Sequence, residues 1–563
     1  MDKRYNSEEW YVWEQNACPM LLIMTLNPSF KNLRDYFGSC LFNTLVVFET
    51  DSANNYQAKW ILRFDEGRIL GQKMVDLLLC PPYMVAFNSG VEVSEERLMK
   101  KANEILANHA QYGVGDIPHI FNEFCELYYA YYRLGAFTEP VQWHTEYLLT
   151  NYLNNHYEGA LSPADALKVL LVTEEDSFSV DILRNLRECA ELLDRATASD
   201  TDLAAYINSK KGLPDFASQI ASYIFQHKDN PAIVALIDSL DSHSKQYHWK
   251  NNNYYATRFV APIDVLADLL DPHHFEVGKT LSYFDGLLQT IAESKQKQLE
   301  QKREVFAELP AYYQNIVSIA NNVGASLIDH RKKNVMICNS AFDVLLSVVA
   351  EATGASIEEL HLLIPQELEY YIQDPKSYTE RFEERKKIFI CLQSDFTLVD
   401  EEIDPMDVSS AEDILKWKVS LTTDPFIAEG ECAEQALEKL NLRMNLFEAS
   451  STDVEKLQGV TAFFDVAHGV IEGVVKIIKN PKIESLNAGE ILVAPSTTPD
   501  YISAINKSAA IITDWGGQTS HAAIVAREMK KPCIIGTNYA SQILRSGQRV
   551  RIDFAQGTIE IIN

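Results

Sequence analysis

Near the end of the sequence, two glycines and two hydroxyl residues precede a histidine. The run is Gly516-Gly517-Gln518-Thr519-Ser520-His521. Glycines let backbone N–H groups approach a ligand closely, and Thr519 and Ser520 add hydroxyl donors. We therefore expect this loop to bind an anion such as phosphate beside His521. A neutral imidazole in that position can act as a nucleophile towards phosphorus.

The elements that must position this loop are a strand before it and a helix after it. Residues 509–513 are almost wholly apolar and predict a strand, whereas residues 522–528 predict a helix. Ser520 is then the expected N-cap, and His521 lies where unpaired N–H groups and the helix dipole favour negative charge. Arg527, almost two turns further on, can reach the same anion. Spacing alone leaves open that His521 is an ordinary helix-start histidine after a glycine turn.

The C-terminal part of the sequence resembles a known domain. The stretches that carry the resemblance are residues 516–528, 532–536 and 491–500, together with Gly459, Gly469 and Gly473. They resemble the phosphohistidine swivelling domain of the phosphoenolpyruvate-utilising enzymes, which include phosphoenolpyruvate synthase, pyruvate phosphate dikinase and rifampicin phosphotransferase. The resemblance implies a compact α/β domain over residues 456–563.

The same resemblance implies roles for individual residues. His521 would be the phosphoryl carrier, and Thr519 matches a family position that lines the active site. Gly516, Gly517, Ser520 and Arg527 would support the phosphate, as their types already suggest. One departure is Trp515, where an acidic residue is frequent in the family; it bears on the surroundings of the loop and not on the nucleophile.

The resemblance also implies a source of the phosphoryl group. In dikinases and synthases this is an ATP-grasp module together with a C-terminal barrel that binds phosphoenolpyruvate or pyruvate. Only 42 residues follow His521, too few for the barrel, and no ATP-grasp pattern is recognisable upstream. We therefore expect ATP and Mg²⁺ to be bound by a separate ATP-grasp partner chain, and we predict no metal site in this chain.

Glycine usage divides the chain. Fifteen of the 23 glycines lie in the first 459 residues and eight in the remaining 104, more than twice the density. The prediction is a multidomain fold, mostly α-helical in its N-terminal and middle regions and followed by the α/β domain. The predicted domains are residues 1–305, 306–455 and 456–563. Outside the C-terminal domain, an early hairpin is predicted from strands at residues 41–50 and 57–65. Two later strands are predicted at residues 388–399 and 417–422. The linker to the C-terminal domain is predicted at residues 448–458.

Residues 306–455 resemble, more weakly, the middle region of rifampicin phosphotransferase-type proteins. Three stretches follow the order of that helical region, namely residues 330–333, 356–368 and 385–387. The resemblance implies an acceptor-binding region, with His330, Arg331 and Lys332 as candidate acceptor-side residues. A basic helix end that is simply solvated is the alternative.

Composition excludes several classes of protein. Asp and Glu number 79 against 50 Lys and Arg, giving a formal charge of −29, which disfavours non-specific nucleic-acid binding. The nine cysteines are scattered and never spaced as Cys-x-x-Cys, so neither a disulfide framework nor a zinc ribbon is expected. The start of the sequence is too acidic and polar for a signal peptide, and no apolar run is long enough to span a membrane. We expect a cytoplasmic protein.

Together these features predict a phosphotransferase component of a split enzyme. A phosphoryl group would pass from the ATP-grasp partner to His521 and on to a small-molecule acceptor in the helical region. Two alternatives stay open: an ATP-dependent ligase component that activates an acid by phosphorylation, and a non-catalytic regulatory or binding protein that retains the shape of the domain.

Overall fold

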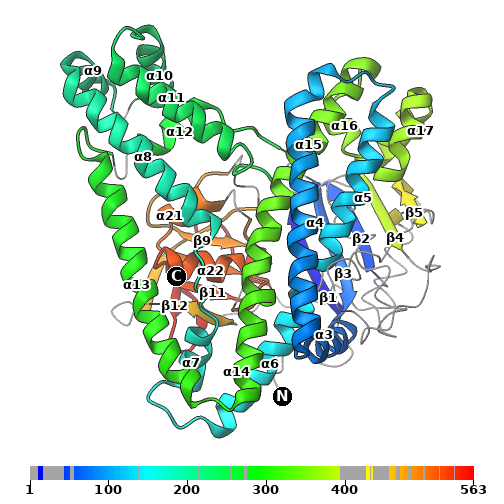
Figure 1. The fold of residues 1–563 in the computed structure, drawn as a ribbon, viewed down its shortest axis with the longest axis vertical. Helices are drawn as coiled ribbons and strands as arrows, with labels where there is room; N and C mark the ends of the chain where they lie inside the picture. Colours follow the sequence, from blue (N-terminus) through cyan, green and yellow to red (C-terminus); the bar gives the residue numbers. More distant parts are fainter. Residues whose placement is uncertain are drawn as a thin grey trace.

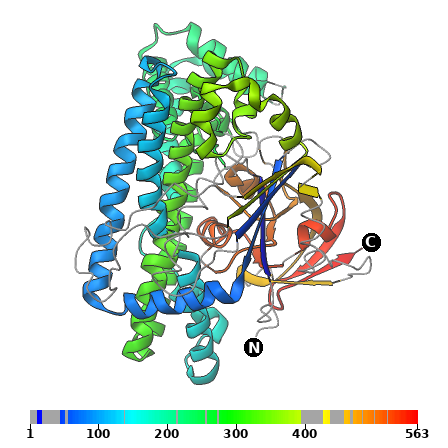
Figure 2. The same cartoon turned by 90° about the vertical axis from the view of Figure 1, so that its right-hand side faces the viewer.

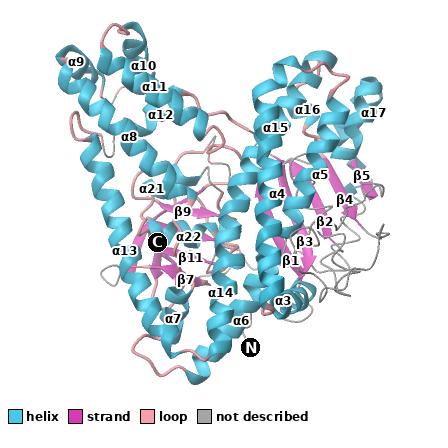
Figure 3. Ribbon diagram, in the orientation of Figure 1, coloured by secondary structure: helices cyan, strands magenta, loops and turns pink. Residues whose placement is uncertain are grey.

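The computed structural model is built mainly of helices, with two sheets (Figure 1). It describes residues 10–16, 44–50, 56–135, 138–211, 213, 215–253, 257–271, 275–393, 426–431, 433–434, 456–464, 469–479, 481, 484–498, 501–518, 520–537 and 539–562. The predicted fold class is confirmed: helices dominate the N-terminal and middle regions, and a mixed α/β domain follows. In Figure 3 the strands of that domain lie between two groups of helices.

The first sheet joins the two ends of the helical region. Its strands are β1 (Trp10–Asn16), β2 (Thr44–Thr50), β3 (Tyr56–Arg63), β4 (Ile388–Gln393) and β5 (Phe426–Glu429). They run antiparallel in the order β1-β3-β2-β4-β5. The predicted early hairpin is the β2–β3 pair, in which Val46 lies opposite Trp60. Figure 2 shows the blue strands from the start of the chain beside the yellow strands of β4 and β5.

The predicted division at residue 305 does not coincide with the end of a helix or strand. That position falls inside one continuous helix, α13 (Thr280–Glu308), and the first sheet takes strands from both predicted regions. The reason is that β4 pairs with β2, more than 300 residues earlier, which no local pattern in the sequence encodes. The predicted strand at 388–399 contains β4, and its later residues, like the predicted strand at 417–422, lie outside the described residues.

Between β3 and β4 lies the helical region, residues 64–387. Its longer helices are α3 (Phe64–Leu78), α4 (Pro81–Asn108), α5 (Ile117–Gly135), α6 (Thr138–His156), α7 (Pro163–Leu170), α8 (Phe178–Ser199), α9 (Thr201–Lys210), α10 (Phe216–Gln226), α11 (Pro231–Gln246), α12 (Pro262–Leu269), α13, α14 (Ala311–Asn321) and α15 (Leu327–Thr353). The shorter ones are η1 (His109–Gln111), η2 (Asn322–Ser326), α16 (Ile357–Leu360), η3 (Pro365–Glu367), α17 (Leu368–Gln373), η4 (Pro375–Tyr378) and α18 (Thr379–Arg385). Local signals set several ends: the Ser162 hydroxyl accepts a hydrogen bond from the Asp165 N–H at the start of α7.

The central helix is longer than the periodicity suggested. A π-helical turn, η2, joins α14 to α15, so one helical stretch runs from Ala311 to Thr353 and ends at Gly354, whose φ is 77°. By length and composition this is the one continuous helical stretch among the described residues that could cross a membrane. Of its most apolar window, 67% is buried inside the molecule, as expected for a core helix of a globular protein.

The C-terminal domain is an eight-stranded mixed sheet with short helices. Its strands are β6 (Lys456–Gln458), β7 (Val460–Phe463), β8 (Val470–Ile477), β9 (Ile491–Ala494), β10 (Ala510–Thr513), β11 (Cys533–Ile535), β12 (Arg549–Asp553) and β13 (Thr558–Ile562), in the order β6-β13-β12-β8-β9-β10-β11-β7. Its helices are α21 (Ile502–Lys507), α22 (His521–Glu528) and α23 (Ala540–Ile543). The strands β8, β9, β10 and β11 are parallel, so strand–loop–helix connections cross over between them.

The sheet of the C-terminal domain has two different cores. One face forms its own apolar cluster around Val493, Ile512 and Ile552. On the other side, Ala523, Val525 and their neighbours belong to the large cluster that extends through the helical region. Figure 1 shows the domain, in orange and red, between α13 on one side and α14–α15 on the other. The helix that His521 begins is therefore packed into the rest of the molecule.

The predicted linker at residues 448–458 is only partly described. Its last three residues form β6, which pairs antiparallel with β13, with Leu457 opposite Ile559. Residues 448–455 lie outside the described residues. The last three residues of the predicted linker therefore belong to the sheet of the C-terminal domain.

Candidate active site

The loop that carries His521 is anchored where it leaves the sheet. It follows β10, and its first residue, Asp514, is buried. The Asp514 carboxylate accepts hydrogen bonds from the Ser541 N–H at 3.0 Å, the Thr537 hydroxyl at 3.1 Å and the Ser541 hydroxyl. At the far end, Ser520 is the N-cap of α22, and its hydroxyl oxygen accepts from the Ala523 N–H at 3.4 Å. The loop is thus fixed at both ends before any ligand is considered.

His521 is the first residue of α22 and is 2% exposed. Its Nδ1 lies 3.0 Å from the Thr497 hydroxyl oxygen, whereas its Nε2 is buried with no hydrogen-bond partner. The Phe178 ring lies nearly parallel to the imidazole, with ring centroids 6.0 Å apart and an interplanar angle of 16°. When Nδ1–H donates to Thr497, Nε2 carries a free lone pair. That tautomer makes Nε2 the nucleophilic atom.

The surroundings keep the imidazole uncharged. Burial, together with the positive charge of Lys332, lowers the pKa of His521 well below its ordinary value of 6.5. At neutral pH the ring is therefore neutral, the form that can attack phosphorus. Burial in turn lowers the pKa of Lys332 to about 8, so this side chain is still mostly charged at pH 7.

Gly516 and Gly517 are needed for different structural reasons. Gly516 has a φ of 125°, and a Cβ there would lie 2.7 Å from the Ser520 hydroxyl oxygen. A Cβ on Gly517 would lie 2.7 Å from Nε2 of Gln142 on α6, a side chain of the helical region. Gly516 is therefore required by the shape of the loop, whereas Gly517 lets the loop approach α6.

This difference predicts unequal effects of two alanine substitutions. Gly516→Ala should destabilise the C-terminal domain by about 1–3 kcal/mol, because only glycine adopts this backbone conformation without strain. Gly517→Ala should cost much less, because the flexible end of Gln142 can move. Pulse proteolysis in urea measures both. Gly286→Ala, whose Cβ would meet nothing within 4 Å, is the control. Equal losses for the two loop variants would contradict this prediction.

Arg527 is buried and lies under the loop. Its Nη2 donates to the Gln518 carbonyl at 2.5 Å and its Nη1 to the Gln518 side-chain oxygen at 3.3 Å. The Gln518 amide in turn donates to the Thr461 carbonyl at 3.0 Å. Burial lowers the pKa of Arg527 to about 10. In this conformation the guanidinium supports the loop backbone, so its role as a direct phosphate ligand stays a prediction. Thr519 lies outside the described residues.

The three acceptor-side candidates on α15 diverge. Arg331 is buried and binds the Glu139 carboxylate, with Nη1 2.8 Å from one oxygen, and the Gly135 carbonyl at 2.7 Å. His330 points to Glu95 and Glu175, both 3.9 Å away. Of the three, Lys332 is the one whose charge contributes to the lowered pKa of His521. The structure thus relates one of the three to the histidine by charge and gives another, Arg331, an ion pair with Glu139.

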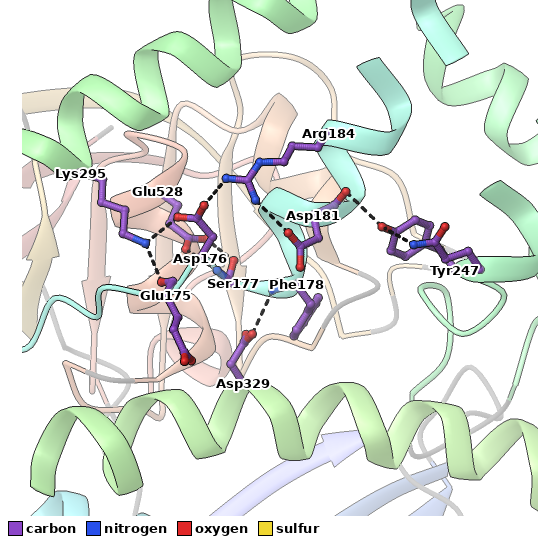
Figure 4. Close-up of polar contacts among 11 residues, drawn as sticks. Glu175, Asp176, Ser177, Phe178, Asp181, Arg184, Tyr247, Lys295, Asp329 and Glu528 are labelled. Carbon is purple, nitrogen blue, oxygen red and sulfur yellow. Dashed lines mark hydrogen bonds and ion pairs between the residues drawn. The ribbon is translucent and has the colours of Figure 1, made fainter. Parts of the chain in front are cut away.

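Five residues of the site were given no role by the sequence. Thr497 and Glu528 lie within stretches that carry the resemblance. Ser177, Phe178 and Asp329 belong to the helical region and meet Glu528 in the contact between the two regions (Figure 4). Ser177 donates its N–H to one Glu528 oxygen at 3.2 Å and its hydroxyl to the other. Phe178 donates its N–H to Asp329 at 3.0 Å. These contacts join residues up to 351 positions apart, and no sequence pattern marks them.

Glu528 makes this contact sensitive to pH. Burial raises the pKa of Glu528 from 4.5 to about 7, and the negative charge of Asp329 raises it further. The hydrogen bonds from Ser177 and the positive charge of Lys295 act in the opposite direction. Arg527 is the charged residue next to Glu528 in the sequence. We call the C-terminal domain docked when it is packed on the helical region, as in this structure. In the docked form, Glu528 therefore holds its proton more tightly than an exposed carboxyl group would. Docking is favoured at low pH and is weakened as the pH rises through 7.

We expect the wild-type chain to be compact at pH 5.5 and more extended at pH 8.5. Small-angle X-ray scattering measures the change. Glu528→Gln, which stays neutral, should expand less than the wild type between the two values; the remaining response is that of Asp329, whose pKa burial raises from 3.8 to about 6. Glu560→Gln, which alters an exposed carboxylate paired with Lys456, is the control and should respond to pH as the wild type does. An identical pH response in Glu528→Gln and wild type would exclude Glu528 as the titrating group.

Comparison with known proteins bears on this domain. Residues 486–557 match the mobile domain of the PEP-utilising enzymes. The probable phosphoenolpyruvate synthase of Staphylothermus marinus is 43% identical over 94 residues, 16% of this chain and 11% of its own length. The phosphoenolpyruvate synthase of Pyrococcus furiosus is 39% identical over 108 residues, 19% of this chain and 13% of its own. A chain of Thermococcus kodakaraensis aconitase X aligns over 19% of this chain and 98% of its own at 25% identity, but its TM-score of 0.16 carries no argument.

The C-terminal domain is therefore a phosphotransferase-type domain. It is a mobile domain of the phosphoenolpyruvate-utilising enzymes, as its sequence predicted, and His521 lies within the matched residues. The chain spans only about a tenth to a sixth of the length of the phosphoenolpyruvate synthases it matches, so the similarity concerns this domain alone.

Proposed function

We propose that the chain carries a phosphoryl group on His521 between a donor on a separate ATP-binding partner and an acceptor in the helical region. The observation that supports this best is the state of the imidazole. Nε2 is buried at the contact between the C-terminal domain and the helical region, is uncharged, and has no hydrogen-bond partner. The imidazole also lies at the start of α22, behind the glycine loop and within the residues that match the mobile domain, where a helix N-terminus favours a bound anion.

The proposed chemistry has two displacements at phosphorus. In the first, the Nε2 lone pair forms the N–P bond while the bond from phosphorus to the donor's leaving oxygen breaks, and that oxygen keeps the electron pair. In the second, an acceptor oxygen attacks phosphorus, the pair of the N–P bond returns to Nε2, and any acceptor proton leaves to solvent. Thr497 holds Nδ1–H throughout. The N-terminus of α22 and the charge of Lys332 offset the charge of the phosphoryl group.

The burial of His521 supports separate donor and acceptor positions. A large donor cannot reach a side chain that is 2% exposed while the domain is docked. The domain would therefore leave the helical region to be phosphorylated and return to transfer the group. We propose a pivot before Lys456, an ATP-grasp partner that binds ATP and Mg²⁺, and a cytoplasmic location, all of which rest on the sequence resemblance and composition.

The experiment that tests this function is phosphate transfer to the intact chain. The chain is incubated with MgATP and an isolated ATP-grasp partner, and intact mass and peptide mapping locate an acid-labile phosphate. We expect one phosphate on His521 only when the partner is present. A parallel reaction with phosphoenolpyruvate identifies the other possible donor. ATP consumption by the chain alone would contradict a split enzyme. No phosphate on His521 from either donor would favour a regulatory or binding protein.

A further inference from the structure

Two residues at the start of α8 bring the helical region into direct contact with His521. They are Ser177 and Phe178, and Figure 4 shows them between Glu528 on one side and Asp329 on the other. Phe178 is 4% exposed, and its ring lies nearly parallel to the imidazole of His521, with centroids 6.0 Å apart. On its other side, the Phe178 ring packs edge-on against Trp249, with centroids 5.4 Å apart. Trp249 therefore restrains the Phe178 ring in its position beside His521.

The backbone of the same two residues is bound by carboxylates from two directions. Glu528, at the end of the helix that His521 begins, accepts the Ser177 N–H at 3.2 Å and also its hydroxyl. Asp329, near the start of α15, accepts the Phe178 N–H at 3.0 Å. Both N–H groups belong to the start of α8, where no helical carbonyl is available to bond them. The helix dipole favours negative charge at this end, but burial outweighs it and raises the pKa of Glu528 to about 7 and that of Asp329 to about 6.

These contacts fix the imidazole in two ways. Phe178 restrains the plane of the ring, and Thr497, within the C-terminal domain, bonds Nδ1 and so sets its rotation. Nε2 is left as the ring nitrogen without a partner. Thr497 moves with the domain, but Phe178 and Asp329 belong to the helical region. The restraint that Phe178 places on the plane of the ring therefore exists only while the domain is docked.

We propose that Phe178 and Asp329 are positioning residues for transfer at the acceptor end. Asp329 fixes the start of α8, and Phe178 then fixes the plane of His521 so that Nε2 keeps one direction in the docked state. This inference rests on the proposed function and extends it, because it assigns part of the transfer geometry to residues almost 200 and 350 positions away from the histidine. At the donor end the imidazole would be held by Thr497 alone.

The test uses the full chain and two small probes. Diethyl pyrocarbonate modifies accessible neutral imidazoles, and its rate at His521 measures how firmly the ring is held against the helical region. Potassium phosphoramidate, a small phosphoryl donor, measures whether Nε2 accepts a phosphoryl group. The variants are Phe178→Leu, which fills much of the same space without a flat ring, Asp329→Ala, which removes the acceptor, and Asp329→Asn, which keeps an oxygen acceptor. The exposed His119 is the internal reference, and circular dichroism checks folding.

We expect Phe178→Leu and Asp329→Ala to raise the rate of modification at His521 about tenfold, equivalent to about 1.4 kcal/mol lost from the docked state. The rate at His119 should not change, and Asp329→Asn should restore a rate close to that of the wild type. Unchanged rates in Phe178→Leu and Asp329→Ala would overturn the proposal, as would an Asp329→Asn variant that behaves like Asp329→Ala. Phosphoramidate distinguishes the positioning role from the proposed function. If it phosphorylates His521 neither in the wild type nor in any variant, His521 is not a phosphoryl carrier, even where the modification rates follow the expected pattern.

Discussion

Replacing His521 with alanine is expected to abolish phosphate incorporation by the chain. The guanidinium of Arg527, on the same helix, cannot replace Nε2, because it is bound to the Gln518 carbonyl and is charged at neutral pH. The loss should exceed about a thousandfold, the scale seen when a nucleophile is removed and only binding groups are left. Intact-mass measurement after reaction with the donor partner, performed without acid, gives the phosphate stoichiometry directly.

Two variants make this result interpretable. His119→Ala removes an exposed histidine of α5 and should leave the stoichiometry at one phosphate per chain. Thr497→Val keeps the volume of the side chain but removes the Nδ1 partner. It should slow phosphorylation of His521 without abolishing it, because the ring can then adopt the tautomer with Nε2 protonated. Full incorporation in His521→Ala would move the carrier to another residue and exclude the proposed mechanism.

Replacing Arg385 with alanine is expected to lower the free energy of unfolding of the helical region by about 3 kcal/mol, the lower end of the cost of breaking a buried ion pair. Arg385 is fully buried and makes two hydrogen bonds to the Glu367 carboxylate, at 2.6 and 2.7 Å, and two to Glu429, at 2.7 and 2.9 Å. Its removal would leave the buried Glu367 carboxylate and the partly buried Glu429 carboxylate with less charge to balance them. Arg381, which contacts the same two carboxylates, limits the loss.

Urea unfolding followed by circular dichroism at 222 nm measures this effect, since helices dominate the signal. The neighbouring substitution Lys386→Ala is the matched control. Lys386 is 41% exposed and pairs with Glu383 and Glu359 at the surface, so its loss should change stability by about 0.5 kcal/mol or less. Equal effects of the two substitutions would mean that the buried network around Arg385 contributes no more than a surface ion pair.

The fold could be predicted where the information is local. Glycine density and apolar periodicity separated the helical region from the C-terminal α/β domain, and a strand, a glycine loop and a helix were placed around His521. The first sheet could not be predicted in this way. Its strand β4 pairs with β2 across the whole helical region, and sequence-adjacent strands are the usual neighbours in a sheet. Nor did periodicity predict that the π-turn at Asn322–Ser326 joins two helices into one.

The candidate site, like the fold, could be predicted only where its residues are close in the sequence. His521 and its loop form one short segment, so residue types and spacing were sufficient to find them. Phe178 contacts the histidine, and Asp329 contacts Phe178, only because one region packs on the other. Asp329 directly precedes the candidates His330, Arg331 and Lys332, but their residue types do not indicate this contact. Arg331 shows another limit of the sequence. The resemblance implied an acceptor-side role, which stays a prediction, and the structure adds a buried ion pair with Glu139 and a hydrogen bond to the Gly135 carbonyl that no spacing indicated.

The first sheet also sets a limit on where phosphate can come from. The chain enters and leaves the helical region through paired strands of this sheet, so the C-terminal domain is tethered to β5 and not to the helices that cover His521. Between Glu434 and Lys456 lies the segment 435–455. Even fully extended, a segment of this length spans no more than roughly 75 Å. Under the proposed function, the domain can carry His521 no further from β5 than the length of this segment and the domain's own width allow, so the proposed donor is expected to bind this chain within that radius.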